Sequence, residues 1–89
     1  MLFEWDEKKR LSTIENRGFD FLDAIELFDG RPALHGRSFF DKEERFVTVA
    51  LLCGKCCTVV WTWRGENRRI ISFRRARDAE ERAYQAIHG

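Results

Sequence analysis

The chain has 89 residues and a formal net charge of +1, and 44 % of its residues are apolar and 35 % charged. This composition excludes a disordered chain, and no apolar run approaches the roughly 20 residues of a membrane span. We expect one cytosolic domain over residues 1–89 without a signal peptide, because charges follow Met1-Leu2-Phe3 at once.

The N-terminal third predicts a strand and two helices. Residues 2–5 alternate apolar and polar side chains, as in a strand. Asp6 is the expected N-cap of a helix that ends near Arg17, before Gly18. A second helix, capped by Asp20 and ended by Gly30, follows. Its buried stripe is expected to consist of Phe21, Ala24, Ile25 and Phe28.

The segment 31–43 lacks a clear periodicity. It holds the only proline of the chain, one glycine and the pair Phe39-Phe40. It is long for a loop in so small a domain, which makes it a candidate functional segment. The alternative is a short additional strand around residues 33–35.

The rest of the chain predicts a three-stranded meander and a helix. The strands are expected at 45–53, 56–64 and 68–75, with turns at Gly54-Lys55 and Gly65-Glu66-Asn67. Asp78 and Glu81 have capping-box spacing, so a final helix is expected from Asp78 to about residue 87. The order β-α-α-β-β-β-α indicates the α+β class, with three helices against an antiparallel sheet.

Three cysteines, Cys53, Cys56 and Cys57, surround one of these turns. An odd number in a cytosolic chain argues against a disulfide framework. Cys53 and Cys56 have the spacing of half a zinc site, but the sequence has no second pair, and the two histidines, His35 and His88, lie far away. A two-residue hairpin turn explains the same residues without a metal.

Arginine dominates the stretch from residue 64 to residue 77, which holds six arginines and one acid, Glu66. Residues 1–58 carry nine basic and eleven acidic side chains, but residues 59–89 carry seven basic and four acidic ones. In the predicted strands, Arg64 and Arg74 share a polar face, while Trp61, Trp63, Ile71 and Phe73 share the buried one. Guanidinium groups on a rigid sheet suit phosphate recognition. The alternative is a solvated face whose arginines pair with carboxylates.

Several separated motifs resemble the BrnT family of type II toxin–antitoxin toxins. The resemblance covers nearly the whole chain, from Phe3 to Tyr84. Its motifs are Phe3-Glu4-Trp5-Asp6-Glu7, Phe21-x-x-Ala24, Phe28-Asp29, Glu44-Arg45-Phe46-Val47, Thr62-x-Arg64-Gly65, Arg69-Ile70-Ile71-Ser72-x-Arg74-Arg75-Ala76, Glu80 and Tyr84.

This resemblance implies a RelE-like fold and a ribonuclease that inhibits translation by cutting RNA. It also implies a BrnA-type antitoxin partner with a ribbon-helix-helix module. The toxin would then meet operator DNA only through the antitoxin complex, in which a dimer is expected. No membrane association and no cofactor are implied.

One departure from the family concerns the end of the first helix. The family usually has Asn shortly before a Lys-His-Gly-Val sequence, and this chain has Thr13, Asn16, Arg17, Gly18 and Phe19 there. Arg17 cannot accept a proton as histidine does, because arginine stays protonated. It can still bind phosphate.

Metal-independent RNA cleavage needs a stabilised phosphorane and groups that transfer protons. No Asp/Glu cluster with two-metal spacing stands in the sequence, which favours this route. Arg64 and Arg74 are the expected phosphorane-stabilising residues. Glu44, Glu80 and Tyr84 are the expected proton-transfer candidates. The expected RNA-binding residues are Arg17, Arg68, Arg69, Arg75 and Arg77.

Other roles are open for these residues. Glu80 has an alternative role as a carboxylate at a helix N-terminus, and Tyr84 as a packing residue. A non-catalytic module that binds a partner protein through the same arginines is the alternative function.

Overall fold

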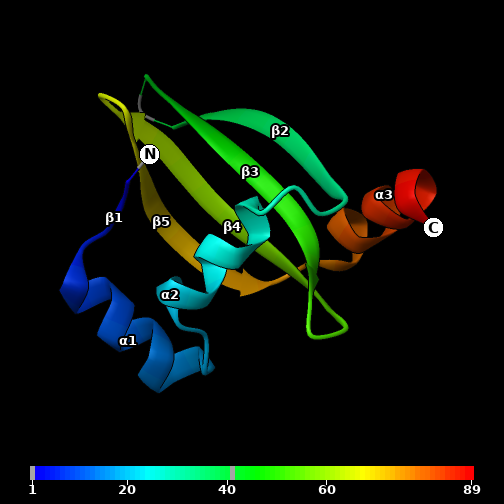
Figure 1. Cartoon of the computed structure of the whole chain (residues 1–89), viewed down its shortest axis with the longest axis horizontal. Helices are drawn as coiled ribbons and strands as arrows, with labels where there is room; N and C mark the ends of the chain where they lie inside the picture. Colours follow the sequence, from blue (N-terminus) through cyan, green and yellow to red (C-terminus); the bar gives the residue numbers. More distant parts are fainter. Residues whose placement is uncertain (1, 41) are drawn as a thin grey trace.

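The computed structural model describes residues 2–40 and 42–89. Five strands form one sheet in the order β1-β5-β4-β3-β2 (Figure 1). The strands are β1 (Phe3–Glu4), β2 (Ala33–Phe40), β3 (Glu43–Leu52), β4 (Lys55–Arg64) and β5 (Asn67–Arg75). The helices are α1 (Glu7–Arg17), α2 (Phe21–Ala24), the 3-10 helix η1 (Ile25–Phe28) and α3 (Asp78–His88). The predicted α+β class and the consecutive pairing of the three meander strands are confirmed.

The two faces of the sheet are covered differently. The inner face packs against α2 and η1, and its core cluster contains Phe21, Leu27, Val59, Trp61 and Phe73. α3 covers only one corner of the outer face, where Tyr84 packs with Val49 and Cys56. Figure 1 accordingly shows α1 and α2 on one side and α3 at the opposite corner. Much of the outer face therefore has no helix over it.

The segment expected to be irregular contains an edge strand instead. β2 spans Ala33–Phe40 and pairs antiparallel with β3 along its whole length. The alternative of an additional strand was correct, but the strand was expected only around residues 33–35 and it extends to Phe40. An edge strand has one paired side and can be polar and glycine-containing, so its sequence lacks the pattern of a central strand.

The second predicted helix is short and changes type after one turn. α2 ends at Ala24, and η1 continues to Phe28. A 3-10 helix has three residues per turn, so Leu27 follows Ala24 on the buried side, and Phe21 lies one turn earlier in α2. Ile25 and Phe28 are only partly buried, which corrects the expected stripe.

The β3–β4 turn is formed by Cys53 and Gly54, one residue earlier than expected. Both have positive φ angles, of 51° and 78°. Two consecutive left-handed residues make the type I′ turn that matches the twist of a hairpin. Lys55 therefore belongs to β4 and pairs with Leu52.

A β-bulge in β5 alters the expected alternation. The register shifts so that Ser72 pairs with Val60 while Ile70 pairs with Trp61, which leaves Ile71 as the extra residue. Ile70 is consequently buried in the core, whereas Ile71 is only partly buried. The prediction that Ile71 lies on the buried face was wrong for this reason.

The N-cap of the last helix lies one residue earlier than its expected capping box, which had Asp78 in that place. Arg77 is the N-cap of α3, and Glu80 accepts a hydrogen bond from the Arg77 backbone N–H at 2.8 Å. Asp78 is therefore the first residue of the helix. No helix in the described part of the chain is long and apolar enough to cross a membrane.

Candidate RNA-binding cleft

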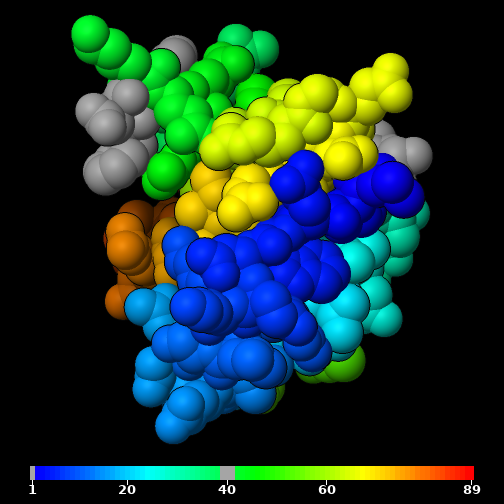
Figure 2. Space-filling model, turned by 90° about the vertical axis from the view of Figure 1, so that its left-hand side faces the viewer, coloured from blue at the N-terminus to red at the C-terminus, as the bar shows by residue number. Residues whose placement is uncertain are grey.

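A polar cleft of about 410 Å³ opens between α1 and the second half of β5. We call it the α1–β5 cleft. Figure 2 views the molecule from this side, with α1 in front of the sheet. Its lining residues are Lys9, Ser12, Thr13, Asn16, Arg17, Ser72, Phe73, Arg74 and Arg77. The lining thus combines four cations with hydroxyl and amide groups and contains no carboxylate.

The fold leaves this cleft open because β1 is only two residues long. β1 pairs with β5 at Arg68 and Arg69 and no further, so the edge of β5 beyond them faces α1. On α1, Lys9, Thr13 and Arg17 recur every four residues and so lie along one face of the helix. This polar stripe forms the second wall of the cleft.

Arg74 is held in the cleft by a two-pronged contact with Glu80. Its Nη1 and Nη2 atoms donate to the two carboxylate oxygens at 2.7 and 3.0 Å. Only 16 % of the Arg74 side chain and 22 % of the Glu80 side chain are exposed. Arg74 is therefore not the free surface group that its strand position predicted, although it does share the outer face with Arg64.

Glu80 is a carboxylate with every oxygen engaged. Besides Arg74, it accepts from the Thr58 hydroxyl at 3.1 Å and from the Arg77 backbone. The hydrogen bonds from Arg74 are the main reason that the pKa of Glu80 is lowered to about 2. A group with that pKa remains ionised near neutral pH and positions Arg74.

The contact with Glu80 leaves one edge of the Arg74 guanidinium available. Of its five N–H donors, two point to Glu80 and one to the Arg75 carbonyl. The Nε–H and one Nη2–H make no bond within the described residues. These two donors form the side-on fork of the guanidinium, which matches two oxygens of a phosphate.

A second, smaller pocket of about 190 Å³ adjoins the cleft. We call it the arginine pocket. It is lined by Asp6, Lys9, Glu43, Arg45, Arg64, Arg69, Ile70 and Ile71. Its charges are partly neutralised, because Arg64 pairs with Glu43 at 3.0 Å and Arg69 with Glu4 at 3.0 Å. Arg74 pairs with Thr58 of β4, and Arg64 lies six residues further along that strand. The backbone positions of Arg64 and Thr58 are therefore about 20 Å apart.

The expected site residues are therefore divided between these places and others. Arg17, Arg74 and Arg77 meet in the cleft, with Glu80 behind Arg74. Arg64 and Arg69 line the arginine pocket. Four expected residues lie in neither place. Glu44 pairs with Arg37 at 3.4 Å, Arg75 is exposed, and Tyr84 is buried and donates to the Pro32 carbonyl at 3.4 Å. Arg68 is the fourth.

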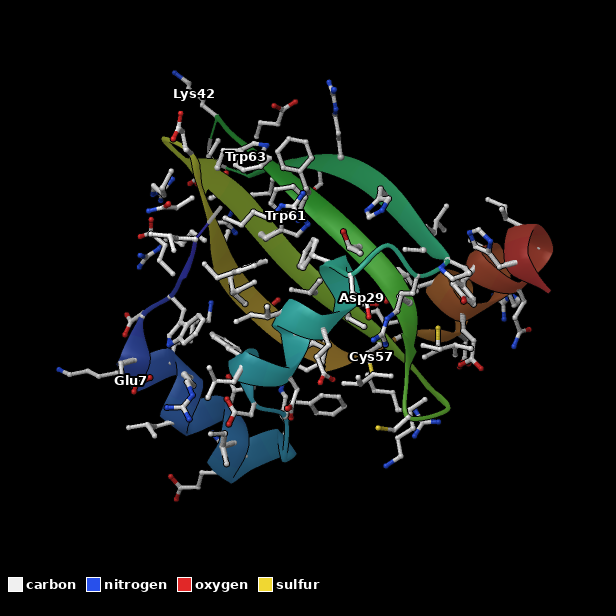
Figure 3. The ribbon with its side chains drawn as sticks, in the orientation of Figure 1. Glu7, Asp29, Lys42, Cys57, Trp61 and Trp63 are labelled. Atoms are coloured by element: carbon white, nitrogen blue, oxygen red, sulfur yellow. The ribbon has the colours of Figure 1, made fainter. Side chains whose placement is uncertain are left out.

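Arg68 lies against aromatic rings of the inner face. Its guanidinium carbon is 4.3 Å from the Phe28 ring centre, 4.7 Å from that of Trp61 and 5.2 Å from that of Trp63. Figure 3 shows Trp61 and Trp63 in succession toward the end of the sheet that holds Lys42. Burial lowers the pKa of Arg68. The bulge at Ile71 is what turns Arg68 to this face and Arg69 to the outer one.

The cysteines do not assemble a metal site among the described residues. Cys56 and Cys57 are buried while Cys53 is exposed, and burial raises the pKa of both buried thiols. No group of three or more His, Cys, Asp and Glu side chains within residues 2–40 and 42–89 is arranged to hold a metal ion.

The structure adds cleft residues that sequence reasoning missed, namely Lys9, Ser12 and Ser72. The four-residue spacing of Lys9, Thr13 and Arg17 was a visible signal, but a polar helix face is usually only solvated. Lys9 also has a lowered pKa. Partial burial of its amino group is the largest cause, and the positive charge of Arg45 is the next.

One comparison with known proteins gives a match. The family model described as the ribonuclease toxin BrnT of type II toxin–antitoxin systems matches residues 5–80. The match begins at Trp5 and ends at Glu80, so it includes all the lining residues of the α1–β5 cleft. A search of curated proteins gives no significant match.

Proposed function

The chain belongs to the BrnT family of ribonuclease toxins of type II toxin–antitoxin systems, and we propose that it cuts RNA in the α1–β5 cleft without a metal ion. We propose further that cutting inhibits translation and that a BrnA-type antitoxin holds the toxin inactive. Membership of a type II system implies a protein antitoxin. The antitoxin type and the route to translation inhibition are expectations from the resemblance.

The observation that carries the proposal is the charge of the cleft. Lys9, Arg17 and Arg77 form no ion pair among the residues that the structure describes, and the lining contains no acid. RNA supplies a negative phosphate at every nucleotide. Uncompensated cations beside a rigid strand are suited to hold that phosphate and to stabilise the extra charge of the phosphorane.

The residues divide the work according to their positions. Arg74 is fixed by Glu80 and presents its side-on fork to the scissile phosphate. Arg17 and Arg77 contact oxygens of the same phosphate from α1 and from the start of α3. Arg64 and Arg69 bind a neighbouring phosphate in the arginine pocket, which they line. In this arrangement the arginine cations supply the charge stabilisation that other nucleases obtain from a metal.

The test is cleavage of a single-stranded RNA oligonucleotide by purified protein in EDTA. We expect products that end in a 2′,3′-cyclic phosphate and no cutting of the same sequence with 2′-O-methyl groups. The double variant Arg17→Gln/Arg77→Gln should lose activity. Arg82→Gln, which removes an exposed arginine of α3 outside the cleft, should not.

A second candidate function follows from one feature of the cleft. Arg17 stands where the family usually has histidine, and a chain without that proton acceptor could bind its partner without cutting RNA. In that case the protein would bind the antitoxin tightly and leave every RNA substrate intact in EDTA and in Mg²⁺. Cleavage in EDTA would exclude this reading.

A further inference from the structure

Lys9 is the residue that the α1–β5 cleft and the arginine pocket share. Among the described residues, it lines both the α1–β5 cleft and the arginine pocket. An RNA strand that places one phosphate in each cavity must pass beside its amino group. Because one nucleotide joins successive phosphates, a strand that runs 5′ to 3′ from the cleft to the arginine pocket places the 5′-oxygen of the cleft phosphate next to Lys9.

The chemistry of the cleft leaves few groups that can release a proton. Apart from Lys9, its titratable lining residues are arginines, which stay protonated and are poor proton donors. The three candidates named from the sequence are engaged elsewhere. Glu44 pairs with Arg37, Glu80 holds Arg74, and the Tyr84 hydroxyl donates to the Pro32 carbonyl. Among the residues the structure describes, Lys9 is therefore the cleft group best able to give up a proton.

The charges around Lys9 favour such a release. Arg45 of β3, Arg69 of β5 and Arg17 of α1 all act to lower its pKa, while Asp6 acts to raise it. The Asp6 carboxylate is already used by the backbone N–H groups of Lys8 and Lys9 at the start of α1. Glu43 and Arg64 line the arginine pocket as one ion pair, and Arg74 and Arg77 line the cleft. The amino group forms no ion pair within the described residues.

We propose, building on the proposed function, that the Lys9 ammonium group donates the proton to the 5′-oxygen that leaves when RNA is cut. The 2′-oxygen attacks phosphorus and loses its proton to solvent. The bond from phosphorus to the 5′-oxygen breaks, and the Lys9 proton moves to that oxygen. The products are a 2′,3′-cyclic phosphate and a 5′-hydroxyl, and Lys9 regains its proton from water. No water or cofactor is consumed.

The test compares Lys9→Arg with Lys8→Arg on two substrates. Lys8 precedes Lys9 on α1, is exposed and lines neither cavity. One substrate is an RNA oligonucleotide with the site mapped on the wild-type protein. The other has sulfur in place of the 5′-oxygen at that site, and its leaving thiolate needs no proton. We expect Lys9→Arg to cut the first substrate about 10²-fold more slowly or worse and the second at nearly the wild-type rate.

The pH profile gives a second readout. Wild-type cleavage of the oxygen substrate should fall as the pH rises through the pKa of Lys9, and this fall should disappear in Lys9→Arg. Lys8→Arg should behave as wild type throughout. Equal slowing of Lys9→Arg on both substrates, or an unchanged pH profile, overturns the inference while the ribonuclease function stands. If the wild-type protein cuts neither substrate, the proposed function fails first and the role of Lys9 fails with it.

Discussion

Glu80 binds Arg74 through both carboxylate oxygens, and this contact joins the start of α3 to the end of β5. The same carboxylate caps the α3 backbone at Arg77 and accepts from the buried Thr58 hydroxyl. One side chain thus fixes a cation of the cleft and the helix that follows it.

Glu80→Gln should lower the free energy of unfolding and change its pH dependence. The pKa of Glu80 falls from 4.5 to about 2, so its contribution is complete above about pH 4.5 and is lost as the pH falls toward 2. The shift corresponds to something on the order of 3 kcal/mol. Urea unfolding at pH 7 and pH 3 measures how much the free energy of unfolding decreases in acid. This decrease should be smaller in Glu80→Gln than in wild type. Glu81→Gln, on the same helix, should show the same decrease in the free energy of unfolding as wild type.

Arg74→Ala should reduce both activity and stability, whereas Arg64→Ala should spare stability. We expect roughly a 10²-fold slower cleavage from Arg74→Ala, as for the loss of one charge-stabilising donor. Unfolding free energy should fall by more than about 1 kcal/mol because Glu80 is left partly buried without its partner. The Arg64 side chain is 49 % exposed, so its removal should cost less than about 1 kcal/mol. Equal stability of the two variants would mean that the contact with Glu80 contributes little.

Arg17→Gln and Arg77→Gln should each weaken RNA binding in a salt-dependent way. Each removed phosphate contact should reduce the slope of log K against log salt by about 0.7 for a single strand. Fluorescence anisotropy with a 2′-O-methyl RNA, which the protein cannot cut, measures this slope. Arg82→Gln should leave it unchanged. A slope that responds equally to all three substitutions would indicate diffuse attraction and not a defined cleft.

Arg68→Ala should destabilise the fold and leave RNA cleavage intact. Its cation lies over three aromatic rings, a contact worth about 1–2 kcal/mol when partly desolvated. Arg68→Met keeps the apolar contact without the charge. Its free energy of unfolding should therefore fall less than that of Arg68→Ala. Denaturation followed by tryptophan fluorescence and cleavage assays on the same samples separate the two effects. A loss of RNA affinity in Arg68→Met at unchanged stability would restore the RNA-binding role expected from the sequence.

The antitoxin should compete with RNA for the cleft. Co-expression and pull-down of the adjacent gene product should yield a tight complex, and added antitoxin should displace 2′-O-methyl RNA. The charge reversal Arg17→Glu/Arg77→Glu should weaken that complex. An antitoxin that binds while RNA stays bound would place its interface elsewhere on the molecule.

The meander and the α+β class were predictable because they rest on local signals. Alternating apolar residues and two short turns determine the pairing of β3, β4 and β5. The full length of β2 could not be predicted, because an edge strand needs no regular pattern. The bulge could not be predicted either, because Ile70 and Ile71 are alike and only the packed sheet determines which one is buried.

The cleft was only half visible in the sequence. The cluster of arginines pointed to β5, and the resemblance pointed to the end of α1. The participation of Lys9 and Ser72 depends on how far β1 extends along β5, which is a tertiary property. The engagement of Arg74 by Glu80 likewise depends on where α3 begins.

The bulge at Ile71 divides β5 into two segments. The alternation of side chains between the two faces of the sheet is offset by one residue from one segment to the other. A relative in which β5 has the same number of residues but pairs with β4 without the bulge would keep every arginine of this strand and still present different ones to each face. The residue aligned with Arg68 would then lie on the outer face with Arg74, and the one aligned with Arg69 would lie against the aromatic rings. A relative that lacks the extra residue altogether would keep both faces as they are here, so arginine positions should be compared only after the bulge residue has been accounted for.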